Sequence, residues 1–218
     1  MRQYNYFRKN NKTMNGAIHV GAHRGEEILR YQRLGVKKVI WIEPDPEVFK
    51  ELQVALDESG ASLVSYAFCC AASNSDNEEV DFNLYYGPDA GYMIGNKGCS
   101  SLLKAKGRFE EWHKDTIKVE SVRLDTLLEE NEFDFADFDH LEMDTQGAEM
   151  MVVQGADKIL EHVKTISTEA TWENPDYIGN TVFSELKEYL EERGFKHVET
   201  IEHDSNWGDA LFVKNYKE

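Results

Sequence analysis

The chain has 218 residues, 41% of them hydrophobic, which suits one compact domain and argues against a disordered chain. Its 24 Lys and Arg residues against 41 Asp and Glu residues give a formal net charge of −17. Because such an acidic balance repels phosphate backbones and anionic membrane surfaces, we expect neither a nucleic acid nor a membrane as partner.

The cysteines and the N-terminal segment indicate the compartment. Cys69, Cys70 and Cys99 form neither a zinc spacing nor a disulfide framework, so we expect a reducing environment and predict no metal ligands from them. Residues 1–15 are polar and are not followed by the apolar segment that a secretory signal needs. No window reaches 18 uncharged apolar residues. We therefore expect a soluble, cytoplasmic protein with a polar extension over residues 1–15 and a single domain over residues 16–218.

The first third of the chain alternates short apolar runs with helical periods, a pattern typical of β/α units. We expect strands at residues 17–20, 39–42 and 62–68, and helices at about 26–34 and from Pro46 onward. Gly35 would end the first helix. Asp45 is a good N-cap for the second helix, because its carboxylate can accept hydrogen bonds from the free N–H groups of the first turn.

The middle of the chain has a different pattern. Residues 80–84 and 117–122 alternate apolar and polar side chains, which indicates half-exposed antiparallel strands. The glycine-rich segment between them, residues 86–116, is long for a loop in a compact domain and is typical of a lid or a binding loop. We therefore expect an insert over about residues 78–123.

The β/α alternation then returns. We expect strands at residues 140–143, 163–167, 195–201 and 210–213, and helices at about 148–160 and 181–193. The last two strands are closely spaced, which suggests an antiparallel edge. The predicted fold class is α/β: a Rossmann-like domain with a mostly parallel seven-stranded sheet, an antiparallel C-terminal edge and an inserted β-hairpin.

Candidate site residues follow the strands, because ligands of open α/β sheets bind beyond the carboxyl ends of the strands. Glycines after the first strand let the backbone approach a ligand closely. The carboxylate of Glu43, at the end of the second strand, can accept hydrogen bonds from both hydroxyls of a ribose. These residues together suit a cofactor that contains adenosine. In chain order the candidates are Gly21, His23, Gly25, Glu43, Cys70, Ala71, Asp144 and Glu169.

The spacing of Gly21 and Gly25 bears on the kind of cofactor. A nicotinamide fingerprint needs G-x-G-x-x-G, whereas here the glycines are spaced G-x-x-x-G, and a P-loop is excluded because no Gly-Lys-Ser/Thr follows. The wider turn favours S-adenosylmethionine, which carries no phosphate. A nicotinamide-binding oxidoreductase and a catalytically silent adenosine-binding module remain as alternatives.

The sequence resembles the FkbM-type methyltransferases, which use S-adenosylmethionine, over about residues 17–169. The resemblance implies methylation of a hydroxyl oxygen on a small molecule or glycan, such as a sugar or a polyketide. It is carried by five motifs in order: HVGAHRG (19–25), WIEPDP (41–46), AASN (71–74), RLDTLL (123–128) and LEMDTQGAE (141–149).

The resemblance also implies roles for single residues. Gly21 and Gly25 would face the methionine and ribose, Glu43 would hold the ribose hydroxyls, and Cys70 and Ala71 would flank the adenine. Asp144 would lie near the sulfonium. The chain departs from the family at three places: His19 replaces an Asp expected to order the loop or to meet the methionine ammonium, His23 replaces an Asn, and Thr145-Gln146-Gly147 replaces Val-Glu-Gly.

A hydroxyl acceptor needs a group that removes its proton. Asp144 and His23 are the candidates, and His113 is a further possibility from the long loop. Glu169 and Trp172 could shape the acceptor pocket, and Ser100 and Ser101 could donate hydrogen bonds to a polyhydroxylated acceptor.

Structural alternatives stand beside these roles. Asp144 could cap a helix, Glu43 could be an ordinary acid at a helix start, and His19 could be a core histidine. A role in the helix dipole or in capping is favoured for Glu149 over a catalytic one.

Overall fold

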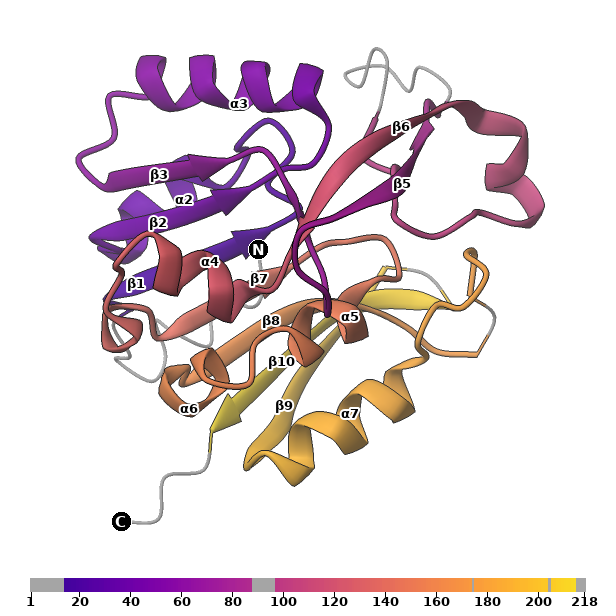
Figure 1. Ribbon diagram of the computed structural model, residues 1–218. Coiled ribbons are helices and arrows are strands. Elements are labelled where there is room, and N and C mark those ends of the chain that lie inside the picture. Colours follow the sequence, from indigo (N-terminus) through magenta and orange to yellow (C-terminus); the bar gives the residue numbers. More distant parts are fainter. Residues whose placement is uncertain (1–13, 88–96, 174, 204, 215–218) are drawn as a thin grey trace.

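A computed structural model describes residues 14–87, 97–173, 175–203 and 205–214. Its centre is a seven-stranded sheet in the order β3-β2-β1-β7-β8-β10-β9 (Figure 1). The strands are β1 (Gly16–Val20), β2 (Lys38–Ile42), β3 (Val64–Phe68), β7 (His140–Met143), β8 (Thr165–Thr171), β9 (Phe195–Glu202) and β10 (Trp207–Lys214). β1 pairs in parallel with β2 and β7, whereas β10 is antiparallel to β8 and β9. The predicted mostly parallel sheet with an antiparallel C-terminal edge is confirmed.

The order of the strands reverses at β1. The chain first builds outward through β2 and β3 and later returns to place β7 on the other side of β1. In an open α/β sheet this switch point is where a ligand crevice forms.

Helices cover both faces of the sheet, and the strands alternate accordingly. The helices are α2 (Ile28–Leu34), α3 (Pro46–Glu58), α4 (Leu124–Glu130), α5 (Glu149–Gln154), α6 (Ile159–His162) and α7 (Phe183–Glu192). On β1, Ile18 and Val20 pack in one hydrophobic cluster with residues of α4 to α7, whereas Ala17 packs in another with residues of α2 and α3. This alternation places one hydrophobic cluster on each side of the sheet.

The expected helix over residues 148–160 is wrong as a single element. Two short helices, α5 and α6, occupy this stretch, and Gly155 lies at the break. A Cβ atom on Gly155 would lie 2.0 Å from the carbonyl oxygen of Ser73. The close approach of two backbones therefore requires glycine here.

The insert and the short strand β4 before it form a second sheet of three strands, the insert sheet, in the order β4-β6-β5. Its strands are β4 (Ala71–Ala72), β5 (Glu78–Tyr85) and β6 (His113–Val122), with the 3-10 helix η1 (Gly107–Trp112) before β6 and another, η2 (Phe135–Asp137), before β7. β5 and β6 are antiparallel, as predicted. Of the glycine-rich segment, residues 88–96 lie outside the described residues. Ser101 exchanges backbone hydrogen bonds with Asn83 of β5, so this part of the segment is fixed to the insert sheet.

The fold begins slightly before the predicted domain boundary. Met14 is buried in the core, and the backbone N–H of Asn15 donates to Asp139 at 2.8 Å. No helix within the described residues is both long and apolar enough to cross a membrane.

Candidate functional site

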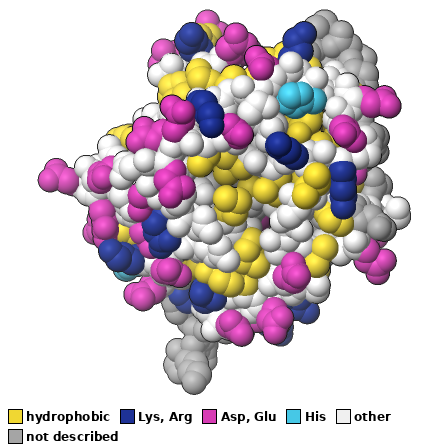
Figure 2. Space-filling view, turned by 45° about the vertical axis from the view of Figure 1, so that its right-hand side comes forward, with side chains coloured by type: hydrophobic (Ala, Val, Ile, Leu, Met, Phe, Trp, Pro, Cys, Tyr) yellow, Lys and Arg dark blue, Asp and Glu magenta, His cyan; other side chains and the backbone are white. Residues whose placement is uncertain are grey.

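A cavity of about 840 Å³ opens at the carboxyl ends of β2, β1, β7 and β8, a size typical of small-ligand sites. It spans the switch point at β1. Figure 2 brings this side of the molecule forward and shows hydrophobic side chains gathered near the middle of the face, with charged side chains around them. Phe82, Leu102 and Phe109 from the insert and the long segment also line the cavity, so it lies between the main sheet and the insert.

The turn after β1 forms one wall of the cavity and depends on Gly21. This residue has a φ of +80°, and a Cβ atom on it would lie 1.8 Å from the carbonyl oxygen of Asp144. The backbone N–H groups of Gly21 and Ala22 both donate to the carbonyl of Ile42, at 3.0 Å. Gly21 therefore lets the turn cross the end of β7, which leaves bare backbone facing the cavity.

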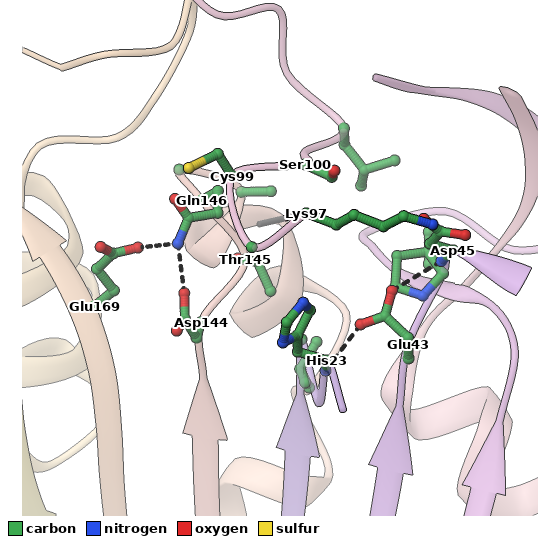
Figure 3. Close-up of a pocket in the computed structure, with 18 of the residues that line it drawn as sticks. His23, Glu43, Asp45, Lys97, Cys99, Ser100, Asp144, Thr145, Gln146 and Glu169 are labelled. Carbon is green, nitrogen blue, oxygen red and sulfur yellow. Dashed lines mark hydrogen bonds and ion pairs between the residues drawn. The ribbon is translucent and has the colours of Figure 1, made fainter. Parts of the chain in front are cut away.

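Glu43 joins the turns after β1 and β2. Its buried carboxylate accepts hydrogen bonds from the backbone N–H groups of His23, at 2.9 Å, and Asp45, at 2.8 Å (Figure 3). Burial raises the pKa of Glu43 to about 7, although these two hydrogen bonds favour its ionised form. The carboxylate therefore braces two loops and still faces the cavity with its remaining lone pairs.

His23 lies between Glu43 and the end of β7. It has a φ of +45°, its Nδ1 atom lies 2.7 Å from Glu26, and its buried Nε2 atom has no hydrogen-bond partner among the described residues. Burial works against the charged imidazole, but the hydrogen bond and charge of Glu26 raise the pKa of His23 above its usual value. The contact with Glu26 therefore favours the protonated form of the ring, which donates hydrogen bonds and accepts none.

Lys97 reaches from the glycine-rich segment to the N-terminus of α3. Its Nζ lies 2.7 Å from Glu47 and 3.7 Å from Asp45, and 5.2 Å from the centre of the Tyr86 ring. Asp45 is the predicted N-cap and accepts from the N–H groups of Glu47 and Val48. Lys97 therefore connects the segment to the side of the cavity nearest β2 (Figure 3).

The opposite side of the cavity holds a cluster of three polar side chains. Gln146 donates from its single Nε2 atom to Asp144, at 2.6 Å, and to Glu169, at 2.7 Å (Figure 3). Its Oε1 atom accepts from the hydroxyl of Tyr177 at 3.4 Å, and Gln146 itself has a φ of +53°. The two carboxylates fix the orientation of the amide, because only its nitrogen can donate to both.

The two carboxyl groups of this cluster resist ionisation. Asp144 opens to the cavity, where the surrounding protein replaces part of the water around its carboxyl group. This partial loss of hydration, with the charges of Asp209 and Glu142, raises the pKa of Asp144 against the opposing hydrogen bond from Gln146. Burial and the charge of Asp144 raise the pKa of half-buried Glu169 well above its usual range.

A buried network underlies the first turn. Glu142 pairs with Arg30 at 2.5 Å and with His140 at 3.1 Å, and accepts from the hydroxyl of Tyr31 at 3.3 Å. The Tyr31 hydroxyl also lies 3.0 Å from Nδ1 of His19. Burial lowers the pKa of His19 to about 4, so His19 is a neutral core histidine with one edge on the cavity.

The structure brings most of the predicted site residues to this cavity. Its wall contains His19, Gly21, His23, Glu43, Ala71, Ser100, Asp144 and Glu169.

Four predicted site residues do not line the cavity: Gly25, Cys70, Ser101 and Trp172. Cys70 is buried in the main core, and Gly25 packs against Ile28 and Leu52. Trp172 packs edge-on against Phe183, at 4.9 Å between ring centres.

Ser101 is fully buried and donates to the carbonyl of Gln146 at 2.9 Å, so it supports the wall rather than facing the cavity. His113 is exposed and hydrogen-bonded to Thr116. Glu149 makes no side-chain cap of α5; its carboxylate instead accepts from the N–H groups of Thr145 and Gly147 in the turn before the helix.

Sequence reasoning did not single out Lys97, Gln146, Glu142 or Tyr177 as site residues. A departure from the family pattern at Gln146 was the one available signal. Among the described residues, no group of three or more His, Cys, Asp or Glu side chains could hold a metal ion.

Comparison of the fold with solved structures gives matches among methyltransferases. A magnesium protoporphyrin IX methyltransferase from Synechocystis PCC 6803, with bound SAM, has a TM-score of 0.53 and 6% identity, covering 98% of this chain and 77% of that one. A putative tRNA (m1A22) methyltransferase from Streptococcus pneumoniae, in complex with S-adenosyl-L-methionine, has a TM-score of 0.53 and 10% identity, covering 100% and 74%. At these identities the likeness shows the fold.

The sequence itself identifies the family. No curated protein matches the chain. The model of the methyltransferase FkbM domain matches residues 19–197, a span that includes both turns at the switch point and the cluster around Gln146. The chain therefore belongs to the FkbM methyltransferase family, and its cofactor is S-adenosylmethionine.

Proposed function

We propose that this methyltransferase methylates a hydroxyl oxygen of an uncharged small molecule or glycan. The observation that carries this proposal is the Asp144–Gln146–Glu169 cluster, which presents carboxylate oxygens to the cavity beside the switch point. The cofactor supplies an electrophilic methyl group. The residues of the chain have to orient the two reactants and remove the hydroxyl proton.

The cavity fits the cofactor at its β2 and β1 side. Glu43 would hold the ribose hydroxyls, and the bare backbone at Gly21 leaves room for the rest of the ligand where a Cβ atom would collide with Asp144. Neighbouring strands lie about 4.8 Å apart. A nucleoside held above β2 would therefore place its sulfonium above β1 and β7, next to Asp144.

Glu142 would replace the carboxylate that the family has at the position of His19. The two residues are direct partners in the β1–β7 register, and Glu142 also lines the cavity. Arg30, His140 and Tyr31 all contact the Oε2 atom of Glu142. Glu142, together with Glu27 on the same wall, would meet the ammonium group of the methionine part.

Asp144 is a better candidate than His23 for removing the hydroxyl proton. His23 is held by Glu26 in a state that favours the protonated ring, which donates hydrogen bonds. Asp144 opens to the cavity and has a raised pKa, which makes its ionised form a stronger base than an ordinary aspartate.

The charges around the cavity support a neutral acceptor. Two Lys or Arg side chains stand among the described lining residues, Arg24 and Lys97, and each is paired with carboxylates: Arg24 with Glu51, and Lys97 with Glu47 and Asp45. The end near β8 carries Asp144, Glu169 and Asp176. An anionic acceptor would be repelled there, whereas a hydroxyl can donate to a carboxylate.

Mass spectrometry of methylated products from a panel of neutral sugars and polyketide alcohols, with S-adenosylmethionine as donor, tests the proposal. We expect methyl transfer to oxygen and a loss of about 10²- to 10⁴-fold in kcat for Asp144→Asn, the usual scale for a general base. Methylation of nitrogen or carbon by the wild type, or an unchanged kcat in the variant, would contradict it.

A further inference from the structure

Asp144 and Glu169 share one hydrogen-bond donor. Both accept from Nε2 of Gln146, at 2.6 and 2.7 Å, so the two carboxyl groups lie on either side of a single nitrogen atom. Two ionised carboxylates held this close repel each other, and a proton on one of them removes the repulsion. The shared donor therefore brings together a carboxyl pair that favours carrying a single proton.

The groups that face the pair favour retention of this proton. The titratable side chains acting on it from the surrounding elements are Asp209 of β10, Glu142 of β7, Glu149 of α5, Glu27 before α2 and Tyr177 after β8. Arg30 pairs with Glu142 and offsets part of its charge. Acids dominate these surroundings and disfavour a second negative charge on the pair.

A bound cation would reverse this balance. The cofactor is a sulfonium cation, and a nucleoside anchored at Glu43 would place that charge beside Asp144, two strands away. A positive charge within about 4–6 Å of a carboxylate favours its ionised form.

We propose that the Asp144–Glu169 pair holds one proton in the absence of a cation, releases it to solvent when S-adenosylmethionine occupies the cavity, and regains a proton from the acceptor hydroxyl during methyl transfer. The last part builds on the proposed methylation of oxygen. In that step the bond between sulfur and the methyl carbon breaks, the bond from that carbon to the acceptor oxygen forms, and the hydroxyl proton passes to the pair. The pair and the cofactor together carry one net negative charge before and after the step.

The pair would therefore distinguish the cofactor from its demethylated product by charge. S-adenosylhomocysteine has the same adenosine and amino-acid groups but no sulfonium. One linked proton changes an affinity by up to about tenfold per pH unit. The affinity of the cofactor relative to its product should rise with pH wherever the pair titrates.

Isothermal titration calorimetry in buffers of different ionisation enthalpy, between pH 5 and 8, measures the protons released on binding each ligand. The two ligands share their adenosine and amino-acid groups, so protons released through those groups are the same for both. The difference in released protons therefore reports the effect of the sulfonium charge. We expect S-adenosylmethionine to release more protons than S-adenosylhomocysteine, by up to one. Equal numbers with normal binding would overturn this proposal alone, whereas failure of both ligands to bind would overturn the cofactor placement as well.

Substitutions of single carboxyl groups test which of them releases the proton. Glu169→Gln should abolish the difference, and Glu173→Gln, an exposed carboxylate just after β8, should keep it. Glu27 is the rival site, because burial raises its pKa to about 7 and it lines the same cavity as Asp144. A difference that disappears in Glu27→Gln and persists in Glu169→Gln would overturn the assignment to the pair. If Glu169→Gln fails a thermal-unfolding check, Asp144→Asn takes its place with the same expectation.

Discussion

Substitution of Glu43 tests two roles separately: its hydrogen bonds to the loops after β1 and β2, and its proposed binding of the ribose. In the wild type its carboxylate accepts two backbone N–H bonds, from His23 and Asp45, inside a buried junction. A hydrogen bond to a charged group contributes about 1.5–3 kcal/mol. Because water in the cavity can reach part of this junction, we expect Glu43→Ala to lower the free energy of unfolding by about 3 kcal/mol, near the lower end for two such bonds.

Glu43→Gln provides the matched comparison. Its amide oxygen can still accept one N–H, whereas its NH₂ group cannot accept the other, so about half of the loss should remain. Urea unfolding measures both variants, with Glu58→Ala at the exposed end of α3 as control. A change of less than about 0.5 kcal/mol in Glu43→Ala, the scale of an ordinary surface substitution, would refute the brace.

The binding role has its own readout. Loss of the ribose hydrogen bonds should weaken S-adenosylhomocysteine by about tenfold to a hundredfold in calorimetry of the folded Glu43→Gln variant. An unchanged affinity with a clear loss of stability would leave Glu43 as a loop brace and refute its contact with the ribose.

Three further substitutions test the geometry around the switch point. His19 is neutral when folded and has a lowered pKa of about 4, so its contribution to stability is present above pH 6.5 and is lost as the pH falls toward 4. The unfolding free energy of the wild type should therefore decline between pH 7 and pH 5, and His19→Asn should remove about 2 kcal/mol of that decline. An identical decline in both proteins would contradict this. Gly21→Ala places a Cβ atom 1.8 Å from the carbonyl oxygen of Asp144 and should lower the melting temperature by several degrees, whereas Gly60→Ala, at a similar φ but with nothing within 4 Å, should cost less. Asp45→Ala removes the N-cap of α3 and should cost about 1 kcal/mol in urea unfolding; no loss would show that water replaces the cap.

The sheet and its hairpin could be predicted because their signals are local. The apolar run at residues 39–42 and the N-cap at Asp45 depend on neighbours in sequence, and the structure reproduces both. The break at Gly155 could not be predicted in this way. It depends on the carbonyl of Ser73, 82 positions earlier in the chain, and the helical periodicity continues across it.

The same distinction between local and long-range signals applies to the site residues. Residues directly after strands, such as Gly21, Glu43 and Asp144, reach the cavity because strand ends define its rim. Ser100 and Ser101 are adjacent in a loop, and sequence alone gives no means of telling which one faces inward. Ser100 lines the cavity, whereas Ser101 is held by the turn at Gln146. Lys97 has no local signal, because its partners lie at the start of α3.

The pairing of His19 with Glu142 has a consequence for how members of this family are compared. Alignment of the β1 motif alone shows that an acidic residue is missing at the position of His19, which suggests an inactive enzyme. In the role proposed for Glu142, the acid lies one strand away, a displacement of about 4.8 Å. On that proposal, catalytic competence in such chains is better judged from neighbouring strands together than from each sequence motif by itself.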